Sequence, residues 1–168
     1  MTSSFMLKHE DIFHNPIDVA ETVIVDRDWV FDRPADSELI AEVNGACCNY
    51  RMWFNWQEDS GAMTLSCTLD TKLPKKTFSK VYALLALVNE KLWMGHFNIS
   101  SEDGTITFRH ALLVRDGAGT SQEHMQELMD LAISECDRFY PALQSVVWGG
   151  KSPSEALTIA IFETVGEA

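Results

Sequence analysis

The sequence has far fewer basic residues than acidic residues, and it lacks long apolar runs. Its 168 residues carry 13 lysines and arginines against 25 aspartates and glutamates, a formal net charge of −12. This charge repels nucleic-acid phosphates and anionic lipid surfaces, so we expect neither as a partner. No stretch approaches the roughly 20 apolar residues of a membrane span, and no signal peptide is visible at the start. We expect a soluble, cytoplasmic protein.

Cysteine is scarce, and residues that could bind a metal are scattered. The four cysteines, Cys47, Cys48, Cys67 and Cys136, form no C-x-x-C pair. Cys47 and Cys48 are adjacent, so they would point to opposite sides of a strand. A reducing compartment is the simplest account of such cysteines. The five histidines form no H-E-x-x-H motif, so we expect no metal site.

Motifs of catalysis and phosphate binding are missing as well. The glycine-rich "DGAGTS" precedes a predicted helix, but it lacks the lysine of a P-loop, and Asp116 and Glu123 flank it. Cys136 lies on an apolar helical stripe between two acidic residues, which disfavour a reactive thiolate. No G-x-S-x-G motif occurs. We therefore expect no catalytic residue, no cofactor and no enzymatic activity.

What the sequence does contain is patterned hydrophobic residues, 46% of the total. Asn15 and Pro16 predict a helix over about residues 16–27, because asparagine caps helices and proline suits the first helical position. Alternating apolar residues predict strands in "WVFDR", "SELIAEVNG", residues 47–57, "MTLSCTLD", "HFNIS" and "GTITFRHALLV". Tight turns between neighbouring strands favour antiparallel pairing.

Apolar residues at helical spacing predict three more helices. The segment "LPKKTFSKVYALLALVNEKLW" should be a helix that begins at Pro74. A long helix should follow a capping box of Thr120 with Glu123, and a short one should follow a second capping box of Ser152 with Glu155.

Together these elements predict an α+β protein, with helices packed on an antiparallel sheet of about five strands. We expect a single domain over residues 15–168, preceded by an N-terminal tail at 1–14. After the middle helix, Gly95 should take the left-handed backbone conformation and stop the helix, so that the chain can turn into the next strand.

The stretch "YRMWFNWQED" places one tryptophan on a polar face. Read with period 2, the face that we assign to the core carries Tyr50, Met52, Phe54 and Trp56. Trp53 points the other way, between Arg51 and Asn55, which suits a contact site with a polar rim. Two alternatives remain open: Trp53 covers the edge of the core, or the N-terminal tail folds over it.

Further apolar residues lie away from the predicted core. Tyr82 and Leu87 fall off the main stripe of their helix, and Trp148 precedes a double glycine. A helix that is apolar on more than one side needs cover on both sides, so we expect a homodimer. The candidate interaction surface comprises Arg51, Trp53, Tyr82, Leu87 and Trp148.

Seven segments, in this order and spacing, resemble the YbjN-type family of bacterial proteins. They are "DWVFDR", "YRMWFNW", "LSCTLD", "LVNEKLWMGHF", "TFRHALL", "RFYPALQSVVWGGKSPSEAL" and "ETVGEA". The resemblance runs from about residue 15 to the end of the chain. It implies a sensory transduction regulator with a fold similar to that of type III secretion chaperones, which are dimers that bind extended segments of other proteins. It implies no catalytic residues.

We therefore expect a non-enzymatic protein-binding module with an unidentified protein partner. It would present sheet edges and apolar grooves to that partner. The first alternative is a dedicated secretion chaperone for one effector. The second is a small-molecule binder or an enzyme, which a deep polar pocket with convergent ionisable groups would favour.

Overall fold

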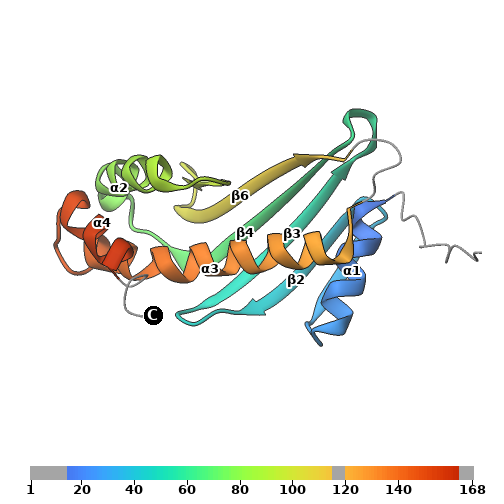
Figure 1. The fold of residues 1–168 in the computed structure, drawn as a ribbon. Coiled ribbons are helices and arrows are strands. Elements are labelled where there is room, and N and C mark those ends of the chain that lie inside the picture. Colours follow the sequence, from blue (N-terminus) through green and yellow to red (C-terminus); the bar gives the residue numbers. More distant parts are fainter. Residues whose placement is uncertain (1–14, 115–119, 163–168) are drawn as a thin grey trace, which may run out of the picture.

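The computed structural model describes residues 15–114 and 120–162, which form helices and strands in alternating groups (Figure 1). Along the chain they are α1 (Pro16–Asp26), β1 (Phe31–Ala35), β2 (Glu38–Asn44), β3 (Asn49–Gln57), a 3₁₀ turn (Glu58–Ser60), β4 (Ala62–Lys72), a second 3₁₀ turn (Lys75–Thr77), α2 (Phe78–Lys91), β5 (His96–Ile99), β6 (Thr105–Leu113), α3 (Gln122–Val147) and α4 (Pro153–Phe162). The predicted tail and most of the glycine-rich loop lie outside the described residues.

The strands of the described chain form one antiparallel sheet in the order β1-β2-β3-β4-β6-β5. This confirms the predicted α+β class, with six strands where we expected about five. The first four strands are consecutive neighbours. The chain then passes through α2 to the edge strand β5, and β6 returns between β5 and β4. The long central strands β3 and β4 therefore have partners on both sides.

One face of the sheet is covered by helices. The strand register aligns Leu39, Phe54 and Leu65 across β2, β3 and β4, and none of the three is exposed to solvent. α1 packs on β2 and β3, whereas α3 crosses β4 and β6 and runs along the sheet toward α2 and α4 (Figure 1). α4 packs on α2 and α3. The described helices thus leave the opposite face of the sheet uncovered.

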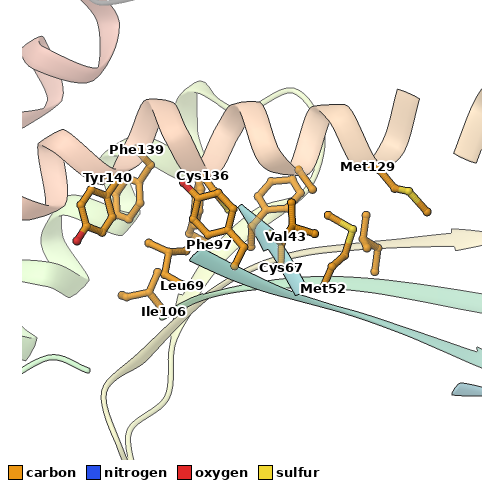
Figure 2. Packing of buried hydrophobic residues seen from close by; sticks show 14 of the residues in the cluster. Val43, Met52, Cys67, Leu69, Phe97, Ile106, Met129, Cys136, Phe139 and Tyr140 are labelled. Carbon is orange, nitrogen blue, oxygen red and sulfur yellow. The ribbon is translucent and has the colours of Figure 1, made fainter. Parts of the chain in front are cut away.

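The core lies between α3 and the sheet. In Figure 2 the α3 side chains Met129, Cys136 and Phe139 point toward residues of the strands. The Phe97 ring stacks on Phe139 with centroids 4.5 Å apart and meets Phe108 edge-on at 5.3 Å. The predicted apolar stripe of α3 is confirmed, since all of its members are buried: Met125, Leu128, Met129, Ala132, Cys136, Phe139, Tyr140 and Leu143.

Two predicted helix caps are confirmed. The Asn15 side chain accepts a hydrogen bond from the Ile17 amide at 2.9 Å, at the start of α1. Before α4, the Ser152 amide donates to the Glu155 carboxylate at 2.8 Å, and the Glu155 amide donates to the Ser152 hydroxyl at 3.3 Å. This is the reciprocal capping box that the sequence predicted.

The predicted start of α3 is wrong by one residue. Ser121 caps this helix, because its hydroxyl accepts a hydrogen bond from the His124 amide at 3.1 Å. Glu123 therefore occupies the second helical position, one short of the place from which a glutamate closes a capping box. The predicted pairing of Thr120 with Glu123 does not form.

Both ends of α2 also differ from the prediction. The helix begins at Phe78, because residues 75–77 form a 3₁₀ turn in which the Thr77 hydroxyl donates to the Pro74 carbonyl at 2.7 Å. It ends at Lys91, so Gly95 is not its stop. The left-handed conformation predicted for Gly95 is confirmed by its φ of +72°, and it serves the turn into β5.

Candidate interaction surface

Trp53 lies near the middle of the uncovered sheet face. Its neighbours in register are Ile40 on β2 and Ser66 on β4, and Ser66 in turn pairs with Arg109 on β6. Trp53 is 38% exposed. Ser66 belongs to this face and is nearly buried, and in register it lies between Trp53 and Arg109. The face therefore has an apolar centre of Trp53 and Ile40.

Charged and polar side chains surround this centre. The Arg51 guanidinium donates to the Glu42 carboxylate at 3.0 Å, and both side chains are more than half exposed. On the next pair of strands, the hydroxyls of Thr68 and Thr107 are 3.1 Å apart. An exposed ion pair adds little to folding stability. Such a polar rim around an aromatic centre is instead typical of protein-binding surfaces.

The structure separates Arg51 and Trp53 from the other three predicted surface residues. Arg51 and Trp53 lie together on the uncovered sheet face. Tyr82 and Leu87 lie on α2, and Trp148 is the 57% exposed C-cap of α3. Sequence reasoning missed Ile40 and Arg109. Ile40 is out of phase with the buried residues of β2, which was visible in the sequence, but its position beside Trp53 depends on the register between strands.

Both edges of the sheet carry features that restrict strand pairing at single positions. Residues 110–113 of β6 extend past β5 and pair with no described strand on that side, so the use of sheet edges stays a prediction. At β5, the Asn89 side chain of α2 accepts from the Phe97 amide at 2.8 Å and donates to the Phe97 carbonyl at 3.0 Å. This carboxamide occupies the place of a neighbouring peptide group. At the other edge, β1 contains Pro34 and an irregular register, both of which hinder strand addition.

Replacing Asn89 with alanine should destabilise the protein by about 2 kcal/mol, because it leaves a buried amide and a buried carbonyl of Phe97 without partners. Urea unfolding measures this loss. Asn44→Ala is the matched control, since Asn44 is exposed at the end of β2, and it should change stability by less than about 0.5 kcal/mol. Equal stability of the two variants would contradict the role assigned to Asn89.

A partly buried polar cluster joins the β2–β3 hairpin to α3. The Tyr50 hydroxyl donates to the Asp137 carboxylate, which also accepts from the Ala46 amide at 2.9 Å. Burial and this carboxylate raise the pKa of Tyr50 far above its usual value. A hydrogen bond with Cys67, together with burial, raises the pKa of the Cys136 thiol. The Tyr50 hydroxyl and the Cys136 thiol therefore stay protonated at neutral pH and suit a structural role. The prediction of Cys136 as a core residue is confirmed.

Two surface hollows in the described chain are lined mainly by polar and acidic groups. One, of about 510 Å³, lies beside Trp56 and is lined by polar groups that include Asp36 and Glu58. Another, of about 370 Å³, lies beside α1, where Arg33 donates to the Asp18 carboxylate at 2.7 Å. Neither lining contains a histidine, cysteine or lysine, and the hydroxyl groups present, Ser37 and Thr22, lie among carboxylates.

The structure describes residues 15–114 and 120–162, and two further findings apply to these ranges. Within these ranges, no three histidine, cysteine, aspartate or glutamate side chains gather closely enough to hold a metal ion. No helix in the same ranges has the length and apolar character needed to cross a membrane.

Comparisons with known proteins bear on the family. The family model for YbjN, described as "Putative bacterial sensory transduction regulator", matches residues 16–145. No curated protein matches the chain. Among solved structures, the chain is similar to the crystal structure of YbjN, a putative transcription regulator from E. coli, with 12% identity and a TM-score of 0.47 over 72% of this chain and 90% of that chain. Because the family model spans most of the chain, from α1 into α3, this protein belongs to the YbjN family.

Proposed function

We propose that this protein is a non-enzymatic regulatory module that binds a protein partner on the uncovered sheet face, and that it works as a homodimer in the cytoplasm. The observation that carries the proposal is Trp53, an exposed tryptophan in the middle of a sheet face that no described helix covers. The family description as a regulator supports a binding role over a catalytic one.

The chemistry of the face indicates the kind of partner. Trp53 and Ile40 supply apolar contact area, and Arg51 and Glu42 supply polar groups of both signs around it. A tryptophan with a polar rim is the common form of a binding hot spot. The partner would contact the side chains of this face, and strand addition at a sheet edge stays a second mode of binding. A secretion-chaperone role would use the same face for an extended effector segment, and it stays an alternative.

Replacing Trp53 with alanine should leave folding nearly unchanged and remove partner binding. The side chain points away from the core and is 38% exposed, so we expect only the loss of its contacts with neighbouring strands, about 1 kcal/mol. Loss of a central tryptophan typically costs 2 kcal/mol or more of binding free energy, which is roughly a 30-fold weaker complex. Wild-type and variant proteins on beads would be compared by quantitative mass spectrometry of the bound fraction.

Val25→Ala is the matched control, because Val25 is 52% exposed on α1, on the other side of the sheet. A protein retained by the wild type and by Val25→Ala, but lost from Trp53→Ala, would support the proposal. Identical sets of bound proteins would contradict it. A large drop in stability of Trp53→Ala would show that the side chain is covered within its own chain.

A further inference from the structure

Arg109 is an exposed cation on the uncovered sheet face, and it has no ion partner among the described residues. Each of the other arginines in residues 15–114 and 120–162 is paired with a carboxylate of its own chain: Arg27 with Asp130, Arg33 with Asp18, Arg51 with Glu42 and Arg138 with Glu135. A guanidinium stays charged at every pH at which proteins work. The charge of Arg109 is therefore available to a group from outside the described chain.

The positions next to Arg109 on this face include no acidic residue. The strand register gives these neighbours as His96 and Asn98 on β5, Thr107 and Ala111 on β6, and Thr64, Ser66 and Thr68 on β4. The whole chain carries a net charge of −12, so a site whose immediate neighbours carry no negative charge is a local exception. A carboxylate that approaches Arg109 meets no like charge on the adjacent side chains.

A second hydrogen-bond donor lies beside Arg109. His96 is its partner in register across β5 and β6, and both side chains are exposed. Residues opposite one another on one face of an antiparallel pair have Cβ atoms about 4.5–5.5 Å apart. The guanidinium of Arg109 and the imidazole of His96 can therefore reach the same anion. A planar guanidinium fork matches the two oxygens of a carboxylate.

Arg109 lies in the same row of the sheet as Trp53, with only Ser66 between them. Neighbouring strands are about 4.7–4.9 Å apart, so the backbones of Trp53 and Arg109 are roughly 10 Å apart. Ser66 is small and nearly buried, so a partner would contact the two long side chains on either side of it. Side chains on one face of an extended segment repeat every roughly 7 Å, and the lengths of the tryptophan and the arginine can close the difference.

From these observations we propose that the partner segment bound on the uncovered sheet face carries an aspartate or glutamate. Its carboxylate binds Arg109 and His96, while an apolar side chain of the same segment packs on Trp53. The inference rests on the proposed function and deepens it, because it names the chemistry of the partner at the same surface.

Selection from a random peptide library displayed on phage would test this chemistry, with the full chain immobilised. The wild type should select peptides that combine an acidic residue with an aromatic or aliphatic one. The net charge of −12 by itself favours basic peptides, so an acidic preference would report a local site.

Arg109→Glu should reverse the preference of the selected peptides from acidic to basic residues. Lys80→Glu is the matched control, because it makes the same change in net charge at an exposed position of α2, on the helix side of the sheet, and its peptides should stay acidic. If Arg109→Glu does not fold, Arg109→Gln should lose the acidic preference. Urea unfolding of Arg109→Gln should match that of the wild type, since Arg109 is exposed, and a large loss of stability would overturn the role assigned to it.

A double-mutant cycle tests the contact itself. A synthetic peptide of the selected sequence, and the same peptide with glutamine in place of its acidic residue, would be titrated against the wild type and Arg109→Gln by fluorescence anisotropy. Each single change should weaken binding by at least about tenfold, as for a hydrogen bond between charged groups. Both changes together should weaken it little more than one, because the same contact is lost only once. Losses that multiply would overturn the inference.

The outcomes separate this inference from the proposed function. Peptides that require Trp53 but bind equally well to Arg109→Gln would overturn the acidic contact and leave binding on the sheet face intact. Peptides that bind equally well to Trp53→Ala and Arg109→Gln would overturn both, as would a library from which the wild type selects nothing.

Discussion

Replacing Phe54 with alanine should destabilise the protein by roughly 3–5 kcal/mol, the usual range for a phenylalanine removed from a packed core. The side chain is completely buried, and its partners in register, Leu39 and Leu65, are buried as well. α1 packs against β2 and β3, so the surrounding groups cannot easily close the cavity. This loss is a large share of the 5–15 kcal/mol that stabilises a typical domain.

Urea unfolding would measure the effect, and two neighbouring positions on β3 are its controls. Trp53 points to the other side of the sheet, so the Trp53→Ala variant should lose little stability. Trp56→Ala lies on the same face as Phe54, but Trp56 is half-buried at the end of the strand, so its loss should be intermediate. If Phe54→Ala fails to fold, Phe54→Leu should still unfold at a clearly lower urea concentration than the wild type. Equal effects at positions 53 and 54 would contradict the assignment of the two faces.

Replacing Gly95 with alanine should be nearly as damaging, for two separate reasons. The backbone of Gly95 has φ of +72°, where an alanine costs roughly 1–2 kcal/mol. An added Cβ would also lie 2.3 Å from an atom of the Phe108 ring and 3.0 Å from the Arg109 carbonyl oxygen. The ring cannot move aside, because it packs against Phe97, which in turn stacks on Phe139. Overpacking of this kind adds about 1–3 kcal/mol.

A Gly150→Ala variant would separate the backbone cost from the steric cost in a thermal unfolding experiment. Gly150 has φ of +68°, but an added Cβ would meet no atom within 4 Å. Gly150→Ala should therefore show the backbone cost alone, while Gly95→Ala should show the backbone and steric costs together. Equal shifts of the thermal midpoint in the two variants would mean that the Phe108 ring moves aside, and no shift at Gly95 would contradict its conformation.

The sequence by itself determined the elements and their buried faces. The alternation in β2 and β4 and the helical spacing in α3 predicted the buried residues, because side-chain direction follows directly from the local period. The caps at Asn15 and Ser152 were predicted for a similar reason, since a cap involves residues only a few positions apart. At α3 the same reasoning placed the cap one residue too early, because Thr120 and Ser121 can both cap a helix.

Only the tertiary structure decided which groups from distant parts of the chain meet. The register between β2 and β3 puts Ile40 beside Trp53, and the packing of α2 on β5 lets Asn89 close the sheet edge at Phe97. Both depend on residues brought together by strand pairing and helix packing, which local periodicity does not encode. For the same reason the predicted surface divided into two. Arg51 and Trp53 follow the alternation of a strand onto the uncovered sheet face, whereas Tyr82 and Leu87 follow the turn of a helix that packs on the other side.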